Sequence, residues 1–369
     1  MLDRLIKVIA LVHFSLAVSV VNAQSSADWP LTDFDKRSIE LSEVMSGGPP
    51  RDGIPPIDSP VFIDSMAADE WLHDDEPVVS FEHAGDARAY PIQILMFHEI
   101  VNDSVGEKPV SVTFCPLCNS SIVFDRRVEG ELLDFGTTGW LRKSDLVMYD
   151  RQTESWWQQF VGKAIIGRYT GTELVQLPSQ IVSYATFKNT YPKGKILSRE
   201  TGFRRNYGRN PYAGYDSINN SPFLFRGDVD PRLPPMERVL SFPDGDGHKL
   251  IPLSALEDRA VVNTETTDGA VVVLAPGSAL SALDQSEITA SRKIPAAAAF
   301  SARVDGQVLT FAVKDGVITD QETGSRWNAF GHAIEGEFEG KRLQQLDKGV
   351  HFAFAWLAFD PNAQIVKIE

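Results

Sequence analysis

The chain of 369 residues has only two cysteines, Cys115 and Cys118. A disulfide-rich scaffold of this length would need many more, so the sequence excludes that class. It also lacks a Gly-x-x-x-x-Gly-Lys phosphate loop, a Gly-x-Ser-x-Gly nucleophile elbow, a His-Glu-x-x-His zinc motif and a dinucleotide-binding glycine fingerprint. The common nucleotide-dependent, serine-hydrolase and metalloprotease mechanisms therefore have no support.

Long apolar runs are also missing, except near the amino terminus. A short basic segment precedes an apolar stretch over residues 8–20, and small residues follow it. About 13 apolar residues are too few to span a bilayer, which needs about 20. The sequence therefore predicts a signal peptide over residues 1–23, cleaved between Ala23 and Gln24. The mature protein is predicted to be periplasmic or secreted, with no integral membrane segment.

Basic residues are scarce. The chain has 35 Lys and Arg against 50 Asp and Glu, a formal net charge of −15. Loss of residues 1–23 leaves this balance almost unchanged, at about −16. Such a surface repels nucleic acid and anionic lipid, so we expect no nucleic-acid partner.

The sequence contains an internal similarity. The segment that begins at Trp156, "WWQQFVGKAIIGRYTGTELVQLP", matches "RWNAFGHAIEGEFEGKRLQQLD", which begins at Arg326. Further blocks match upstream, and the shared residues are mainly Gly, Pro, Trp and apolar residues, which determine turns and cores. The sequence predicts an α+β, β-dominated fold with two tandem similar units, residues 71–200 and 237–369. Residues 24–70 form a Pro- and Gly-rich lead, and residues 201–236 form a connector.

The second unit lacks residues that could carry chemistry. The alignment replaces four of them in the second unit: Cys115 by Ala275, Cys118 by Ser278, His98 by Arg259 and Met148 by Ile318. A copy that keeps packing residues and loses its soft ligands is typical of a degenerate duplicate. We therefore expect the functional site in the first unit.

Local patterns predict a strand, a tight turn and a strand around the cysteines, because β-branched and aromatic residues flank them on both sides. Short helices are expected within residues 91–103, 184–192 and 354–361.

The cysteine pair has three interpretations. A structural disulfide across so short a loop would add only about 2 kcal/mol of stability. Reversible thiol–disulfide exchange would need an exposed sulfur and a partner. A metal site would need further ligands, for which His98 and Met148 are the candidates, and a Cys, Cys, His and Met set prefers copper(I) to zinc.

Longer motifs point to a family. The chain resembles the domain-of-unknown-function 3179 family of bacterial exported proteins through "AYPIQILMFHEIVND", "VSVTFCPLCNSSIVFDR", "LDFGTTGWLRKSDLVMYDRQTESWWQQFVGKAIIGRYTGTEL" and "VDPRLPPMERVL". The resemblance brings no established reaction. It implies chemistry at the cysteine pair, because some relatives carry selenocysteine there. The family pattern covers His98, Glu99, Asn102, Asp103, Cys115, Pro116, Cys118, Gly139, Ser144, Met148, Asp150 and Trp157.

The leading hypothesis is an exported protein with a redox or copper-binding centre. Cys115 and Cys118 are redox thiols or metal ligands, His98 is a ligand or local base, and Met148 is a further soft ligand. Asp150 and Trp157 are the predicted cofactor-binding residues, with Trp157 covering the site. An unidentified redox or metal-delivery partner is expected. The alternative is a non-enzymatic binding module in which the cysteines form only a stabilising disulfide.

Overall fold

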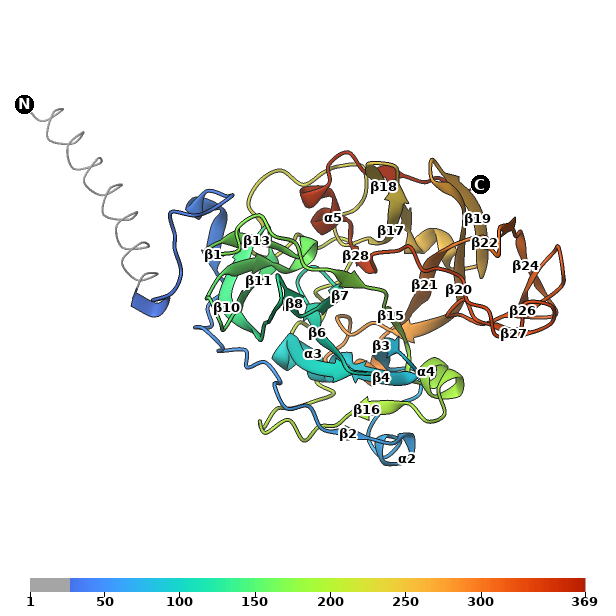
Figure 1. The fold of residues 1–369 in the computed structure, drawn as a ribbon, viewed down its shortest axis with the longest axis horizontal. Coiled ribbons are helices and arrows are strands. Elements are labelled where there is room, and N and C mark those ends of the chain that lie inside the picture. The colour runs from blue at the N-terminus through green and yellow to red at the C-terminus, as the bar shows by residue number, and fades with distance from the viewer. Residues whose placement is uncertain (1–26, 369) are drawn as a thin grey trace, which may run out of the picture.

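The structure is a computed structural model that describes residues 27–368, so the predicted signal peptide lies outside the described residues. It contains 42% strand and 12% helix, which confirms the β-dominated fold. Figure 1 shows residues 71–200, here called the first region, packed beside residues 237–369, the second region. No helix within residues 27–368 is long and apolar enough to cross a membrane.

Three sheets and a short hairpin form the first region and its lead. The first sheet has the order β15 (Gln180–Ser183), β3 (Pro77–His83), β4 (Asp86–Pro91), β16 (Lys195–Leu197) and β2 (Phe62–Ile63). The second has the order β14 (Gln176–Leu177), β7 (Ser120–Asp125), β6 (Lys108–Cys115) and β5 (Ile100–Val105). The third has the order β1 (Val44–Ser46), β10 (Phe135–Arg142), β11 (Asp145–Asp150), β12 (Trp156–Gln158) and β13 (Lys163–Ile166). The hairpin pairs β8 (Arg127–Val128) with β9 (Glu131–Leu132).

The second region contains three sheets that repeat this strand order, except that β1, β2 and β14 have no counterpart strand. They are β28 (Val350–Phe352), β17 (Arg238–Asp244), β18 (Gly247–Pro252) and β29 (Gln364–Ile365); β19 (Val261–Thr266), β20 (Gly269–Leu280) and β21 (Lys293–Ser301); and β24 (Phe311–Lys314), β25 (Val317–Asp320), β26 (Arg326–Trp327) and β27 (Ala333–Glu335). The hairpin of β22 (Arg303–Val304) and β23 (Gln307–Val308) stands where β8 and β9 stand in the first region. In both regions the strand after the last helix, β16 or β29, pairs in parallel with the second strand of the region.

Helices are few and short, and the three predicted ones are present. They are α3 (Ile92–His98), α4 (Tyr184–Thr190) and α5 (Ala353–Phe359), with α2 (Ser65–Ala68) in the lead. Single 3-10 turns occur as η1 (Leu41–Glu43), η2 (Gln159–Val161), η3 (Leu253–Leu256) and η4 (Ile288–Ala290). The helix α3 begins after Pro91, whose missing N–H is no loss at a helix start, and ends where Glu99 turns left-handed with φ 56°. This end brings Glu99 into the interior.

The same hydrogen bonds recur in the two regions. Asn102 exchanges two bonds with the backbone of Phe135, and Asn263 does so with Phe311. Trp157 Nε1 donates to Asp150 over 2.9 Å, as Trp327 Nε1 does to Asp320 over 2.9 Å. The residues that the sequence comparison aligned therefore hold equivalent turns and strand ends.

Two turns differ between the regions. One is the β10–β11 turn of the first region, where residues 139–146 extend the hairpin beyond Thr138 and Val147. The corresponding β24–β25 hairpin of the second region closes directly through Asp315 and Gly316. The other is the β6–β7 turn of the first region, which residues 116–119 close tightly. In the second region the corresponding strands β20 and β21 continue past that level to the pair Leu280 and Lys293.

The lead and the connector lie against these sheets. In the lead, β1 pairs with β10, and the Trp29 ring meets the rings of Tyr149 and Trp156 edge-on. The connector, residues 201–236, has no helix or strand and contacts both regions, because Tyr215 bonds to Leu117 and Gly214 bonds to Asp284.

Candidate metal centre

The cysteines lie at the β6–β7 turn. Cys115 ends β6, and the turn is closed by bonds from Cys118 N to Cys115 O and from Asn119 N to Pro116 O, both 3.3 Å. Asn119 is left-handed, with φ 49°, a conformation that Asn tolerates better than most residues. The turn brings the two sulfurs to 4.2 Å, and both cysteines are free thiols.

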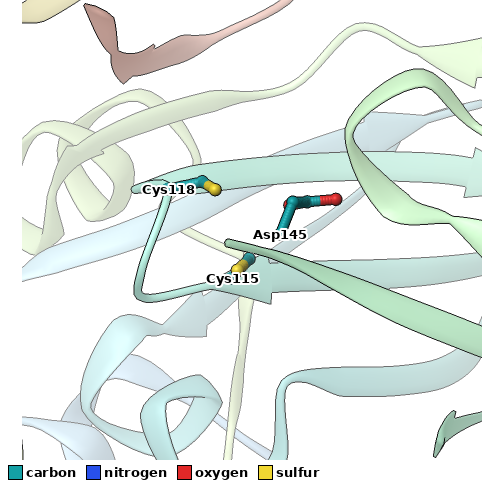
Figure 2. Close-up of side chains that lie close together, drawn as sticks. All are labelled: Cys115, Cys118 and Asp145. Atoms are coloured by element: carbon teal, nitrogen blue, oxygen red, sulfur yellow. The ribbon is translucent and has the colours of Figure 1, made fainter. Parts of the chain in front are cut away.

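Asp145 brings a carboxyl group to the sulfurs. Lys143 and Ser144 form the β10–β11 turn, both left-handed with φ 54° and 66°, and Asp145 opens β11 directly after it. One carboxylate oxygen and the two sulfurs all lie within 4.8 Å of one another. Figure 2 shows Asp145 beside the cysteine turn. This three-residue group is the only one of its kind within residues 27–368.

The two oxygens of Asp145 have different surroundings. Oδ2 accepts hydrogen bonds from Gln158 Nε2 at 2.6 Å and from the Phe160 amide at 2.9 Å. Oδ1 is buried and makes no conventional hydrogen bond within residues 27–368, and the neighbours available to the carboxyl group there are the two thiols, which are weak donors. A buried carboxylate oxygen of this kind is normally paired or bound to a metal.

The carbonyl oxygen of Ser144 also faces the sulfurs. It lies 3.5 Å from Cys118 Sγ and 3.9 Å from Cys115 Sγ. The left-handed conformation of Ser144 places this carbonyl here, at a cost that a non-glycine residue bears only where the surroundings enforce it. The group thus offers two sulfur and two oxygen donors.

Burial keeps the two thiols protonated in the absence of metal. The exposed fractions of Cys115, Cys118 and Asp145 are 1%, 0% and 0%. Burial raises the pKa of the Cys115 thiol and raises that of Cys118 well above its usual value. Burial also raises the pKa of Asp145 to about 7, although hydrogen bonds from Gln158, the Phe160 amide and the two thiols act to lower it.

Glu99 adds a second acidic group. Burial, and then the negative charge of Asp145, raise the pKa of Glu99 to about 8. Like Ser144, it is a left-handed non-glycine residue. A carboxyl group held in this way in a strained conformation is characteristic of functional sites.

His98 has other partners. Its side chain is fully buried, Nδ1 donates to the Pro55 carbonyl at 2.7 Å, and Nε2 accepts from the Tyr207 hydroxyl at 2.6 Å. Burial lowers the pKa of His98, which keeps the ring neutral. The sulfur–carboxylate group does not include His98. Coordination by His98 therefore stays a prediction, and it would require Nε2 to give up Tyr207.

Met148 and Asp145 lie on opposite faces of β11. Asp145 bonds to Gln158, which pairs with Val147, whereas Met148 pairs with Trp157 on the other face. Met148 is completely buried in the core. Its role as a soft ligand also stays a prediction.

The Asp150–Trp157 pair has a packing explanation. Asp150 accepts bonds from the Thr153 amide and from Trp157, and Asp320 accepts the same two bonds from Thr323 and Trp327. The second region holds this arrangement without any cysteine. Cofactor binding by Asp150 and Trp157 remains a prediction, and this pair shows no feature that is particular to the first region.

Sequence reasoning missed Asp145, and with it the carbonyl of Ser144. The available signal was a charged residue at the start of the apolar strand "DLVMYD", in a stretch where the second region is shorter. The alignment through Met148 and Ile318 did not reveal this difference in length, because it pairs Asp145 with another acid, Asp315. Asp315 lies exposed at the turn.

Fold and site together define a β-rich protein with an interior sulfur–carboxylate centre that could hold a metal ion. The model of the family described as "Protein of unknown function (DUF3179)" matches residues 51–363. The chain belongs to this family, as its motifs indicated. No curated protein and no solved structure matches the chain.

Proposed function

We propose that this chain is an exported metal-binding protein whose centre consists of Cys115, Cys118 and Asp145. The observation that carries the proposal is a buried group in which two free thiols and a carboxylate oxygen of Asp145 lie within 4.8 Å of one another, with no conventional hydrogen bond to Oδ1 among the described residues. Thiols are weak hydrogen-bond donors, so this buried carboxyl group is poorly paired, and a bound cation would pair it better. The Ser144 carbonyl is the fourth donor.

The donor set favours zinc over the copper that the sequence suggested. Thiolates bind both metals, but a carboxylate is a hard ligand that suits Zn²⁺ better than Cu⁺. Tetrahedral coordination with Zn–S bonds of about 2.3 Å places two sulfurs about 3.8 Å apart. The separation of 4.2 Å needs only a small adjustment. Cu⁺ remains the competitor, because His98 or Met148 would complete a softer set.

We further propose that the second region is a duplicated copy that has lost the centre. The matching strand orders and the repeated Asn and Asp–Trp hydrogen bonds support this origin. The copy then serves as structural support for the first region.

Export remains part of the proposal, with cleavage between Ala23 and Gln24 and a metal-delivery or redox partner in the periplasm or medium. Burial of the thiols would protect them in an oxidising compartment, where exposed thiol pairs form disulfides.

Anaerobic titration of the reduced mature protein with Zn²⁺ and Cu⁺ in competition with chromophoric chelators tests the proposal. We expect one tightly bound ion per chain and loss of binding in Cys115→Ser. His98→Gln and Met148→Leu should leave Zn²⁺ affinity within a few-fold of wild type. Equal binding by wild type and the cysteine variant would refute a metal centre here, and weaker Cu⁺ binding in Met148→Leu would restore the softer ligand set.

Dithiol redox is the second candidate, supported by the free thiols and the carboxyl group beside them. In the exchange, two thiols become a disulfide and release two protons, while a disulfide on a partner protein takes up two electrons and two protons. Asp145 could accept the first proton. This function ranks second, because burial disfavours the thiolate that must attack.

Redox titration with glutathione buffers distinguishes the candidates. A reversible dithiol potential in a protein that takes up no metal would favour exchange. A pair that stays oxidised under mild reductant would favour the stabilising disulfide, as would a Cys115→Ser/Cys118→Ser protein that folds normally and keeps its other binding properties.

A further inference from the structure

One connector hydroxyl links the segments that form the centre. The Tyr215 hydroxyl donates to the carbonyl of Leu117, inside the cysteine turn, at 3.1 Å. It accepts from the Phe223 amide, also at 3.1 Å. The Phe223 carbonyl in turn accepts from Ser144 Oγ. The cysteine turn and the Ser144 turn are therefore held together through Tyr215.

The same stretch of connector packs beside the cysteine turn. Tyr212 and Tyr215 both pack against the hydrophobic core that contains Cys115 and Cys118. The thiols are almost without solvent exposure, so a metal ion or reagent can reach them only if some covering segment moves. Residues 212–223 have no regular secondary structure, so the bonds above and their anchor determine how easily they move.

The second region anchors this segment next to Tyr215. The Asp216 side chain is fully buried and accepts bonds from Arg238 at 2.8 Å, from Arg292 at 2.7 Å and from Ser281 Oγ. Ser281 and Arg292 flank the loop between β20 and β21. This is the arm that continues where the first region has its cysteine turn.

We infer that Tyr215 is a positioning residue that holds the cysteine turn and the Ser144 carbonyl in register, and that residues 212–223 are the movable cover of the centre. The metal-related part of this inference rests on the proposed function. The cover itself does not, because it governs access to the thiols whatever they do.

Tyr215→Phe tests the inference, since it keeps the ring and removes only the hydroxyl. Tyr207→Phe is the matched control, because Tyr207 lies in the same connector but its hydroxyl bonds to His98 and Thr201. In the reduced metal-free protein, we expect Tyr215→Phe to react with an aromatic disulfide reagent about tenfold faster than wild type. Tyr207→Phe should stay within about twofold.

A second variant acts at the anchor. Arg292 is 44% exposed, so Arg292→Ala should fold even if Tyr215→Phe does not. It should also speed thiol modification, whereas Arg326→Ala, which breaks an exposed ion pair with Glu335, should not. If the thiols of both Tyr215→Phe and Arg292→Ala react at the wild-type rate, residues 212–223 are not the cover of the centre.

Cobalt loading tests the positioning of the donors. The thiolate-to-cobalt absorption band of Tyr215→Phe should shift, and the ion should leave about tenfold faster to a chelator, with no such change in Tyr207→Phe. An unchanged band and release rate would overturn the positioning role. If wild type binds no Co²⁺ or Zn²⁺ yet Tyr215→Phe exposes the thiols, the proposed metal function fails and the cover stands.

Discussion

The two regions share the order of most of their strands and differ at two turns, while β1, β2 and β14 have no counterpart strand in the second region. The first region closes β6–β7 tightly and extends β10–β11, whereas the second extends β20–β21 and closes β24–β25 tightly. All the donors of the proposed centre lie at the two turns of the first region that differ. Strand order can therefore persist while turn length decides whether a centre exists.

The second region could not hold the centre even with cysteines restored. The alignment placed Ser278 opposite Cys118, but Ser278 lies inside the β20–β21 ladder, paired with Pro295. The side chain of a paired strand residue projects from a sheet face, so it cannot approach residue 275 across a tight turn as Cys118 approaches Cys115. The hairpin extension that presents Asp145 and Ser144 in the first region is also missing from β24–β25.

The largest expected effect separates the two hairpins that differ. Asp145→Asn should weaken Zn²⁺ binding by about a hundredfold to a thousandfold, because structural zinc sites owe about 10–16 kcal/mol to about four ligands. Chelator competition measures it. Asp315→Asn, in the corresponding hairpin, is the control and should bind as wild type. If both variants bind equally well, Asp145 is not a ligand.

The next prediction is a loss of stability that should be equal for matching glycines in the two regions. Gly167 and Gly336 have φ 96° and 101°, and a Cβ on either would lie 2.9 or 2.8 Å from the Cα of Ser155 or Ser325. Gly167→Ala and Gly336→Ala should each reduce the free energy of unfolding by about 3 kcal/mol, since backbone must shift in both. Thermal unfolding measures this loss. A large loss in one variant alone would argue against equivalent turns.

Substitution of Trp157 or Trp327 should cause a smaller loss of stability. It also tests whether Trp157 only stabilises its turn or takes part in cofactor binding. Trp157→Phe and Trp327→Phe each remove one N–H donor from a buried carboxylate, which should cost about 2 kcal/mol. Metal affinity should not change in either. If Trp157→Phe alone loses metal, the cofactor role predicted from the sequence is right.

Sequence patterns were sufficient for the elements but not for the whole centre. Strand–turn–strand around Cys115 and the helix over Ile92–His98 follow from local periodicity and turn residues, which need no knowledge of distant contacts. Asp145 joins the cysteines from a different sheet, across a separation in sequence that no local pattern encodes. His98 fitted the chemistry by residue type, but type alone could not reveal that Pro55 and Tyr207 occupy both ring nitrogens.

The smallest expected effect is the change in the free energy of unfolding of the metal-free protein per pH unit. Glu99, which the alignment replaces by Ala260, has its folded-state pKa raised by burial from its ordinary value of 4.5 to about 8. Between these values the folded state binds more protons than the unfolded state, so stability falls as pH rises. We expect a loss of about 1 kcal/mol per pH unit between pH 5 and 7, measured by urea unfolding.

Glu99→Gln should flatten this slope, because the amide does not titrate. Asp347 in the second region, whose pKa burial raises to about 7, provides the comparison. Asp347→Asn should also flatten part of the slope, but of the two variants only Glu99→Gln should change the pH at which Zn²⁺ binds, because the charge of Asp145 affects the pKa of Glu99 and not that of Asp347. Equal shifts of metal binding in both variants would mean that Glu99 acts through overall stability, and that the centre contains one acid, Asp145, rather than two.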